Sequence, residues 1–324
     1  MDAPTAALDA SSRERRPAWS GHYYTIVPNL IDTARQPSAP PAVTWATTID
    51  DPTLGLVPLR GWLHEPQGSR AASPLVVLVH GLGGHSDSRY LRRAATRAAA
   101  LGLSSLRLGL RGADGDGIDL HHAGQSEDLC AVIDALPERF RDIYLLGYSL
   151  GGHLVLRAAT QSTSPRLRAA AAICAPLDLE PVQAAIDHPR AWIYRRWVLR
   201  GIWRSYEPIA ARHPHLPSMD AVRDLTTVRG FDEHVIAPRF GFADAADYYR
   251  QASVAAHLGS LRVPALLLAT EDDPMVPAPV LRRTLAGVDA PRLEIRWLAG
   301  GHLGLPAALD VHGRALRWMQ HIVG

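Results

Sequence analysis

Short, continuous runs of apolar residues recur along the chain, and segments with helical spacing separate them. A continuous apolar run of roughly four to eight residues is typical of a strand buried on both faces, as in a parallel sheet. One further segment, Leu293–Trp297, alternates apolar and polar residues with the period of two that is typical of a strand. The continuous runs that we predict as strands are Leu75–Val79, Leu103–Leu108, Ile143–Leu146, Ala169–Cys174 and Ala265–Leu268.

Segments with helical spacing lie between these strands. Strands that alternate with helices of roughly 10 to 15 residues are typical of βαβ units. We therefore predict an α/β protein with a mostly parallel, doubly wound sheet flanked by helices. Ahead of the first run, residues 43–64 suit two strands joined by a turn at Asp50-Asp51-Pro52. The predicted helices are Arg89–Leu101, Gln125–Leu136, Leu150–Thr160, Ala278–Leu285 and a final helix from Pro306.

The alternation stops at Pro176 and resumes with the run Ala265–Leu268. Residues 177–255 lack a regular strand signal and are rich in aromatic residues, so we interpret them as a helical cap insertion. The α/β core then consists of residues 43–176 and 256–324. A length of 324 residues suggests about two domains of the usual size, but one interrupted α/β unit accounts for it equally well.

Residues 1–42 differ from the rest in composition. They are rich in Ala, Pro, Ser and Arg and show little periodicity. We predict a loosely attached N-terminal arm, from which Trp19, Tyr23 and Tyr24 pack on the body.

Composition and charge exclude several classes of function. The 34 basic and 32 acidic residues leave a net charge of +2, which gives no reason to expect a nucleic-acid partner. The chain has no lysine, which excludes a lysine Schiff base and a P-loop. The two cysteines, Cys130 and Cys174, are not in C-x-x-C spacing, and we interpret them as small buried hydrophobic residues. No stretch approaches the roughly 18 to 20 apolar residues of a membrane span, and no secretory signal is visible, so we expect a soluble, cytoplasmic protein without an integral membrane segment.

One helix of the cap insertion carries an arginine stripe together with three tryptophans. The helix could lie on lipid as a lid, or it could pack within the cap with a solvated arginine face. Its apolar residues are spread around the helix, which favours the second interpretation and leaves peripheral lipid contact as the alternative. The residues concerned are Arg196, Arg200, Arg204, Trp192, Trp197 and Trp203.

A G-x-S-x-G sequence, Gly147-Tyr148-Ser149-Leu150-Gly151, follows the predicted strand Ile143–Leu146 and opens the next helix. This strand–turn–helix setting is typical of a nucleophile elbow, in which glycines permit a tight turn that exposes the serine. The adjacent helix N-terminus favours negative charge that develops on a substrate oxygen. We therefore predict Ser149 to be a nucleophile.

A serine nucleophile needs a base that a third group orients, and in this architecture the order along the chain is Ser, Asp, His. The loop Gly300-Gly301-His302-Leu303-Gly304 follows the strand Leu293–Trp297, and its glycines let the chain bend toward Ser149. We predict His302 as the base. The acid is Asp273 or Asp272, both of which follow the strand Ala265–Leu268; Asp273 is favoured because the next residue is a proline, which keeps it extended.

An oxyanion hole requires two backbone N–H groups near the serine. Leu150 supplies the first, and Leu82 in the loop His80-Gly81-Leu82-Gly83-Gly84 is the predicted second donor. His80 itself is interpreted as a structural hydrogen-bonding residue rather than a base. We predict no metal site, because the pairs His121-His122 and His213-Pro214-His215 have no carboxylate or cysteine framework nearby.

Over roughly residues 43–320 these motifs resemble the α/β-hydrolase superfamily, and within it the YheT-like branch of predicted esterases. One departure from the family pattern is Ala113 with the acidic, glycine-rich stretch Asp114–Asp119, which follows the pair Arg111-Gly112. The segments that carry the resemblance are His80–Tyr90, Arg111-Gly112, His122–Leu129, Gly147–Gly152, Phe231-Asp232, Asp247–Tyr249, Ala252-Ser253, Asp272–Pro274 and Gly300–His302.

The resemblance implies a triad of Ser149, Asp273 and His302, with Leu82 and Leu150 at the oxyanion hole. It implies hydrolysis of carboxylic esters, with short- to medium-chain acyl esters or monoacylglycerols as the small-molecule substrates and no cofactor. Some eukaryotic relatives transfer acyl groups to alcohols, so acyl transfer is one alternative. A ligand-binding protein without catalysis is the other.

Overall fold

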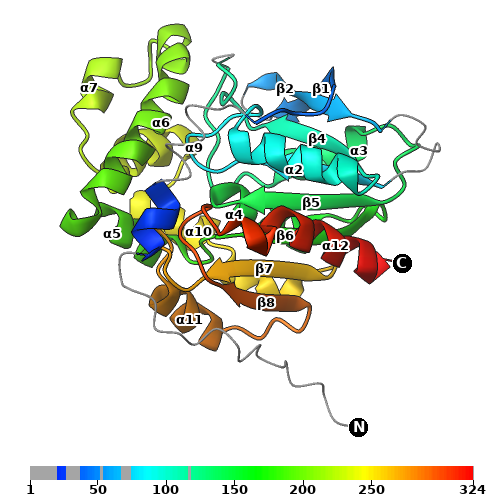
Figure 1. Cartoon of the computed structure of the whole chain (residues 1–324). Helices are drawn as coiled ribbons and strands as arrows, with labels where there is room; N and C mark the ends of the chain where they lie inside the picture. Colours follow the sequence, from blue (N-terminus) through cyan, green and yellow to red (C-terminus); the bar gives the residue numbers. More distant parts are fainter. Residues whose placement is uncertain (1–19, 27–36, 52–53, 67–73, 116–117, 324) are drawn as a thin grey trace.

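The computed structural model of the chain describes residues 20–26, 37–51, 54–66, 74–115 and 118–323. In this part of the chain eight strands form one sheet in the order β1-β2-β4-β3-β5-β6-β7-β8 (Figure 1). The first two strands pair antiparallel, β2 is antiparallel to β4, and the other neighbours are parallel. The strands are β1 (Val43–Asp51), β2 (Gly55–His64), β3 (Leu75–Val79), β4 (Ser104–Gly109), β5 (Ile143–Tyr148), β6 (Leu167–Ile173), β7 (Ala265–Thr270) and β8 (Leu293–Leu298).

The continuous apolar runs form the buried strands at the centre of this sheet, as predicted. In β3, Val76 and Leu78 belong to one buried cluster, whereas Leu75, Val77 and Val79 belong to another. Successive side chains of a strand point to opposite faces, so a run that is apolar throughout requires a covering layer on each face. The predicted doubly wound arrangement is confirmed.

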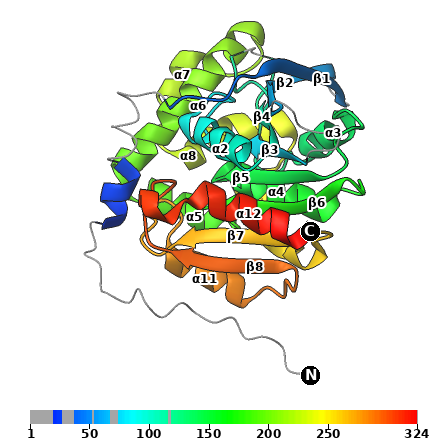
Figure 2. The same ribbon diagram turned by 45° about the vertical axis from the view of Figure 1, so that its right-hand side comes forward.

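Helices supply both layers (Figures 1 and 2). One face is covered by α2 (Arg89–Ala100) and α12 (Val311–Val323). The other face is covered by α3 (Glu127–Ala135), α4 (Leu150–Gln161) and α11 (Ala278–Ala286). The prediction of the final helix was wrong at its start, because a 3-10 turn at Ala307–Leu309 and a left-handed Asp310 precede it.

The segment between β6 and β7 contains helices and no strand among its residues 177–255, all of which the structure describes. Most of its buried apolar residues form a separate cluster, which also includes Leu120, Leu150 and Met275 from outside the segment. Its elements are α5 (Leu179–Asp187), η2 (Pro189–Ala191), α6 (Trp192–Arg212), α7 (Met219–Arg223), α8 (Val228–Phe231), η3 (Asp232–Ile236), α9 (Ala237–Phe240) and α10 (Ala245–Ala252), followed by η4 (Ala255–Ser260).

Helix α6 buries one face and exposes the other. Its arginines Arg196, Arg200 and Arg204 are exposed, as predicted. The prediction that its tryptophans pack in the cap was wrong for Trp192 and Trp197, which are 56% and 53% exposed. No helix in the described part of the chain is both long enough and apolar enough to span a membrane.

The prediction of a loosely attached arm was wrong for residues 20–26. They form a short helix in which Ser20, Gly21 and Thr25 are buried. Tyr23 is 48% exposed and Tyr24 is half-buried, so the packing predicted for these two side chains is partial. Trp19 lies outside the described residues.

Candidate active site

Ser149 stands between the end of β5 and the start of α4, on a strained backbone. Its φ and ψ are 51° and −120°, a conformation that residues other than glycine rarely adopt. The turn leaves no room for larger neighbours: a Cβ atom at Gly147 would lie 2.1 Å from the carbonyl oxygen of Gly151, and a Cβ atom at Gly151 would lie 2.3 Å from that of His80. The geometry is that of a nucleophile elbow.

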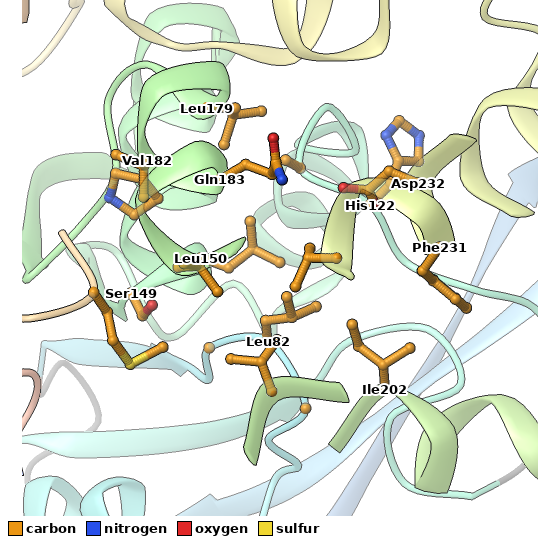
Figure 3. Close-up of a pocket in the computed structure, with 18 of the residues that line it drawn as sticks. Leu82, His122, Ser149, Leu150, Leu179, Val182, Gln183, Ile202, Phe231 and Asp232 are labelled. Atoms are coloured by element: carbon orange, nitrogen blue, oxygen red, sulfur yellow. The ribbon is translucent and has the colours of Figure 1, made fainter. Parts of the chain in front are cut away.

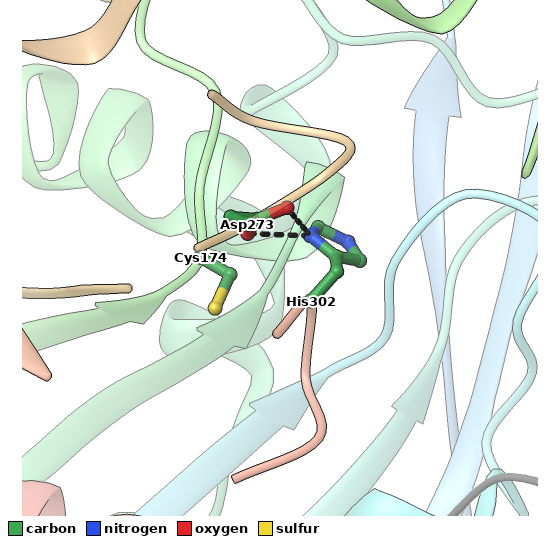
Figure 4. Close-up of side chains that lie close together, drawn as sticks. All are labelled: Cys174, Asp273 and His302. Carbon is green, nitrogen blue, oxygen red and sulfur yellow. Dashed lines mark hydrogen bonds and ion pairs between the residues drawn. The ribbon is translucent and has the colours of Figure 1, made fainter. Parts of the chain in front are cut away.

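The loops after β7 and β8 bring an acid and a histidine to this serine, in the predicted order along the chain. The Nε2 atom of His302 lies 3.0 Å from Oγ of Ser149. Its Nδ1 atom lies 3.1 and 2.9 Å from the two carboxylate oxygens of Asp273 (Figure 4). This arrangement suits the tautomer in which Nδ1–H donates to Asp273 and Nε2 accepts the serine proton.

The geometry distinguishes between the two aspartates that the sequence leaves as candidates. Asp273 is 5% exposed, and its Oδ1 also accepts the backbone N–H groups of Met275 and Val276, at 2.8 and 2.9 Å. Asp272 instead accepts a hydrogen bond from the hydroxyl of Ser20, at 3.0 Å. Asp273 is therefore the carboxylate that contacts the histidine.

The loop after β3 passes directly over Ser149. A Cβ atom at Gly81 would lie 3.0 Å from Cβ of Ser149, so a larger residue would push the two backbones apart. The backbone N–H of Gly81 donates to the hydroxyl of Tyr90, at 3.0 Å. Leu82 and Leu150 both line the pocket beside the serine. The N–H of Leu150 belongs to the first turn of α4, where N–H groups have no partner within the helix.

His80 stabilises this loop through hydrogen bonds of its ring with backbone groups. It is fully buried, its Nδ1 lies 2.8 Å from the carbonyl oxygen of Gly81, and its Nε2 accepts the backbone N–H of Leu110. Burial lowers the pKa of His80 to about 3, with a further contribution from His121. A neutral ring with both nitrogens in backbone hydrogen bonds agrees with the structural role predicted for it.

An apolar pocket opens beside Ser149 and extends under the helices of the cap insertion (Figure 3). The serine lies at one side of the pocket, and Leu82 and Leu150 lie close to it. The helices α5, α6 and α8 also supply apolar side chains to the lining, among them Leu179, Val182, Ile202 and Phe231.

A polar group faces this pocket away from the serine. Asp232 lines it together with His122 and Gln183 (Figure 3). Burial raises the pKa of Asp232 to about 7, against the opposing effect of a hydrogen bond that the Tyr249 hydroxyl donates to it at 2.6 Å.

Sequence reasoning did not place Asp232 or Tyr249 in the pocket. Both belong to residues 177–255, so their hydrogen bond lies within the insertion. Tyr248 links the insertion to the core, because its hydroxyl accepts the backbone N–H of Ala123. Asp232, Tyr248 and Tyr249 all line the pocket and are buried. No sequence signal marked them as pocket residues.

Among the described residues, one group of side chains has the spacing of metal ligands: Cys174, Asp273 and His302, whose donor atoms lie within 4.8 Å of one another (Figure 4). Burial, followed by the charge of Asp273, raises the pKa of the Cys174 thiol, and a protonated thiol is a poor ligand. The oxygens of Asp273 already accept hydrogen bonds from His302 and the backbone. The donors therefore suit an acid–histidine pair better than a metal site.

The family model of the alpha/beta hydrolase family matches residues 76–312. The chain belongs to this family. This alpha/beta hydrolase is 27% identical over 260 residues to YheT of Escherichia coli K12, whose name describes it as a candidate esterase; the match covers 78% of this chain and 76% of YheT.

Two further similarities concern a lipase and a solved esterase. The monoacylglycerol lipase of Saccharomyces cerevisiae is 24% identical over 229 residues, which cover 63% of this chain and 49% of the yeast protein. The chain thus spans about half the length of that relative. The structure of the Pyrococcus furiosus esterase Pf2001 superposes with a TM-score of 0.57 at 15% identity, covering 90% of this chain and 100% of the esterase, which shows the common fold.

Proposed function

We propose that this alpha/beta hydrolase cleaves carboxylic esters through an acyl-enzyme on Ser149. The observation that carries the proposal is the chain of hydrogen bonds from Ser149 to His302 to Asp273 beside an apolar pocket. Relatives named as esterase and lipase support an ester as the substrate. No cofactor takes part in the proposed reaction.

Acylation begins when Nε2 of His302 takes the hydroxyl proton of Ser149 and Oγ attacks the ester carbonyl carbon. Asp273 accepts Nδ1–H, fixes the ring tautomer and stabilises the imidazolium. The imidazolium then donates its Nε2 proton to the departing alcohol. In deacylation His302 removes a proton from water, which attacks the acyl-enzyme. His302 then returns this proton to Oγ of Ser149 as the bond from the acyl carbon to Oγ breaks and the acid is released.

The backbone N–H groups of Leu82 and Leu150 stabilise the tetrahedral oxyanion in this proposal. The tight approach of Gly81 to Ser149 supports a donor in the loop after β3. The start of α4 adds the partial positive charge of a helix N-terminus on the same side.

The proposed substrates are short- to medium-chain acyl esters or monoacylglycerol-like esters. The apolar lining supplied by Val182, Ile202 and Phe231 supports an acyl chain as the occupant of the pocket. Residues 177–255 act as the cap that builds this pocket, on a core made of residues 43–176 and 256–324, and residues 1–42 precede the core.

The direct test replaces the nucleophile. With p-nitrophenyl acetate and butyrate, Ser149→Ala is expected to lose about 10³- to 10⁶-fold in kcat/KM, and loss of only a few-fold refutes the assignment. A fluorophosphonate probe is expected to label Ser149 in the unchanged chain and not in the variant. Absence of labelling and turnover in the unchanged chain would favour a ligand-binding protein without catalysis.

Transfer of the acyl group to an alcohol is the alternative within the same mechanism. Adding ethanol to the ester assay and comparing acid with ethyl ester product distinguishes the two. Hydrolysis predicts the acid as the main product while ethanol is a minor component of the solvent.

Peripheral contact with lipid would suit a lipid-like ester. The exposed residues Trp192, Ile193 and Trp197 on α6 support it, because Trp197 also lines the pocket and exposed arginines lie on the same helix. Sedimentation with anionic phosphatidylglycerol vesicles tests this contact, and absence of binding at low salt contradicts it. The matched variant Trp192→Ser with Trp197→Ser is expected to bind less.

A further inference from the structure

The short helix at residues 20–26 lies against the loop that carries His302. Five of its residues make contacts with the loops after β7 and β8 or with α6, although more than 150 positions separate them in sequence. These contacts come from a segment whose composition predicts little structure. They suggest that the segment does more than cover the core.

Thr25 makes the contact closest to the proposed chemistry. Its Oγ1 accepts the backbone N–H of His302 at 2.8 Å. The same hydroxyl donates its hydrogen to the carbonyl oxygen of Gly21, at 2.7 Å. Because its hydrogen is already donated, the hydroxyl presents a lone pair to His302. Thr25 is 6% exposed, so water is a poor substitute for it.

Glycines bring the two backbones into contact. A Cβ atom at Gly301 would lie 2.2 Å from both the carbonyl oxygen of Gly21 and Oγ1 of Thr25. A Cβ atom at Gly304 would lie 1.6 Å from the carbonyl oxygen of Tyr24. The glycines on both sides of the histidine are therefore required for docking as well as for bending the loop.

The same segment also touches the acid loop and the cap. Ser20 donates to the carboxylate of Asp272 at 3.0 Å. Nδ1 of His22 lies 2.5 Å from the hydroxyl oxygen of Tyr194 on α6, and the two rings stack at a centroid distance of 5.7 Å. The segment therefore joins three elements that surround the proposed triad.

We infer that Thr25 is a positioning residue for His302, and that residues 20–26 are a clamp that keeps the imidazole within hydrogen-bond distance of Ser149. This inference rests on the proposed function. Asp273 orients the ring through Nδ1, whereas Thr25 holds the backbone from which the ring extends. Both constraints are needed because Leu303 has a positive φ of 58°, a conformation that a loop keeps only when its surroundings enforce it.

Loss of the Thr25 acceptor leaves a buried N–H without a partner and lets the loop relax. A misplacement of about 1 Å at a catalytic group can cost about 10²-fold in rate. The effect is expected in kcat, because Thr25 does not line the pocket that holds the acyl chain.

The test compares Thr25→Val, which keeps the shape and removes the acceptor, with Thr25→Ser, which keeps the acceptor. We expect Thr25→Val to lose about 10- to 100-fold in kcat with KM changed by less than about threefold, and Thr25→Ser to remain within about threefold of the unchanged chain. Thr160→Val is the matched control, since Thr160 is 8% exposed and its hydroxyl donates within α4, to the carbonyl oxygen of Arg157. It is expected to leave kcat unchanged.

The inference is overturned if folded Thr25→Val keeps its kcat, or if Thr25→Ser loses as much as Thr25→Val. Should Thr25→Val fold poorly, Gly21→Ala supplies a second test, because its methyl group would lie 1.8 Å from the carbonyl oxygen of Asp272 and displace the segment. Ser149→Ala is measured in the same assay. Activity in Ser149→Ala refutes the proposed function, whereas an inactive Ser149→Ala beside a fully active Thr25→Val refutes only the clamp.

Discussion

Both carboxylate oxygens of Asp273 lie within hydrogen-bond distance of Nδ1 of His302, at 3.1 and 2.9 Å. The N–H groups of Met275 and Val276 hold the carboxylate in this orientation. The imidazole is therefore held by a group that is itself fixed, which is what a histidine base requires if it is to keep one tautomer.

Replacing Asp273 should remove most of the activity, whereas replacing its neighbour should not. Asp273→Asn no longer enforces the Nδ1–H tautomer, so kcat is expected to fall by about 10³- to 10⁴-fold. Asp272→Asn keeps an oxygen that can accept from Ser20 and is expected to stay within about threefold. Steady-state hydrolysis of p-nitrophenyl butyrate measures both, and equal losses would contradict the assignment of Asp273.

The strained backbone of Ser149 predicts that this residue lowers the stability of the folded protein. Ser149→Gly relieves a strain of about 1 to 3 kcal/mol, from which the greater freedom of glycine in the unfolded chain subtracts about 1 kcal/mol. We expect the free energy of unfolding in urea to rise by about 1 kcal/mol while activity is lost. Ser149→Ala is the control, because alanine keeps a Cβ atom at the same φ of 51°. A Ser149→Gly variant no more stable than Ser149→Ala would show that the elbow is unstrained.

The raised pKa of Asp232 predicts a pH dependence of stability. Its pKa is about 7 in the folded protein and about 3.9 in an unfolded chain, so between these values the folded state binds more protons. The contribution of Asp232 to the free energy of unfolding is therefore present below about pH 4 and is lost as the pH rises through 7. Asp232→Asn removes this titration, so its stability relative to the unchanged chain should improve by on the order of 2 kcal/mol from about pH 5 to about pH 8.

Urea unfolding of the unchanged chain and of Asp232→Asn, at about pH 5 and at about pH 8, measures the difference between their free energies of unfolding. Asp134→Asn is the control, since Asp134 is exposed and its variant should show the same pH dependence as the unchanged chain. A difference that stays constant with pH would mean that Asp232 titrates normally.

The apolar pocket predicts a preference for longer acyl chains. Each additional buried methylene contributes about 0.8 kcal/mol, so kcat/KM should rise by about fourfold per methylene from acetate until the chain fills the pocket. Val182→Trp narrows the pocket and should shift the optimum to shorter chains, with acetate hydrolysis as the internal control. A p-nitrophenyl ester series from acetate to decanoate gives the profile. Equal kcat/KM for all chain lengths in the unchanged protein would show that the acyl chain lies elsewhere.

Local pattern accounts for most of the fold and for the order of the site residues. The apolar runs predict the strands β3 to β7, because a strand between two helical layers must be apolar on both faces. The sequence around Ser149 predicts the elbow, because only glycines fit so tight a turn. These features depend on neighbours a few positions apart, so the sequence by itself determined them.

Tertiary structure decided what depends on contacts between distant segments. Asp272 and Asp273 are adjacent, and although Pro274 favours Asp273, it is the path of the loop that brings Asp273 to His302. The place of Asp232 in the pocket depends on the packing of short helices that show no period of their own. The contact between Thr25 and His302 joins residues 277 positions apart, and it forms because glycines in the histidine loop allow two backbones to touch, a complementarity that neither segment reveals alone.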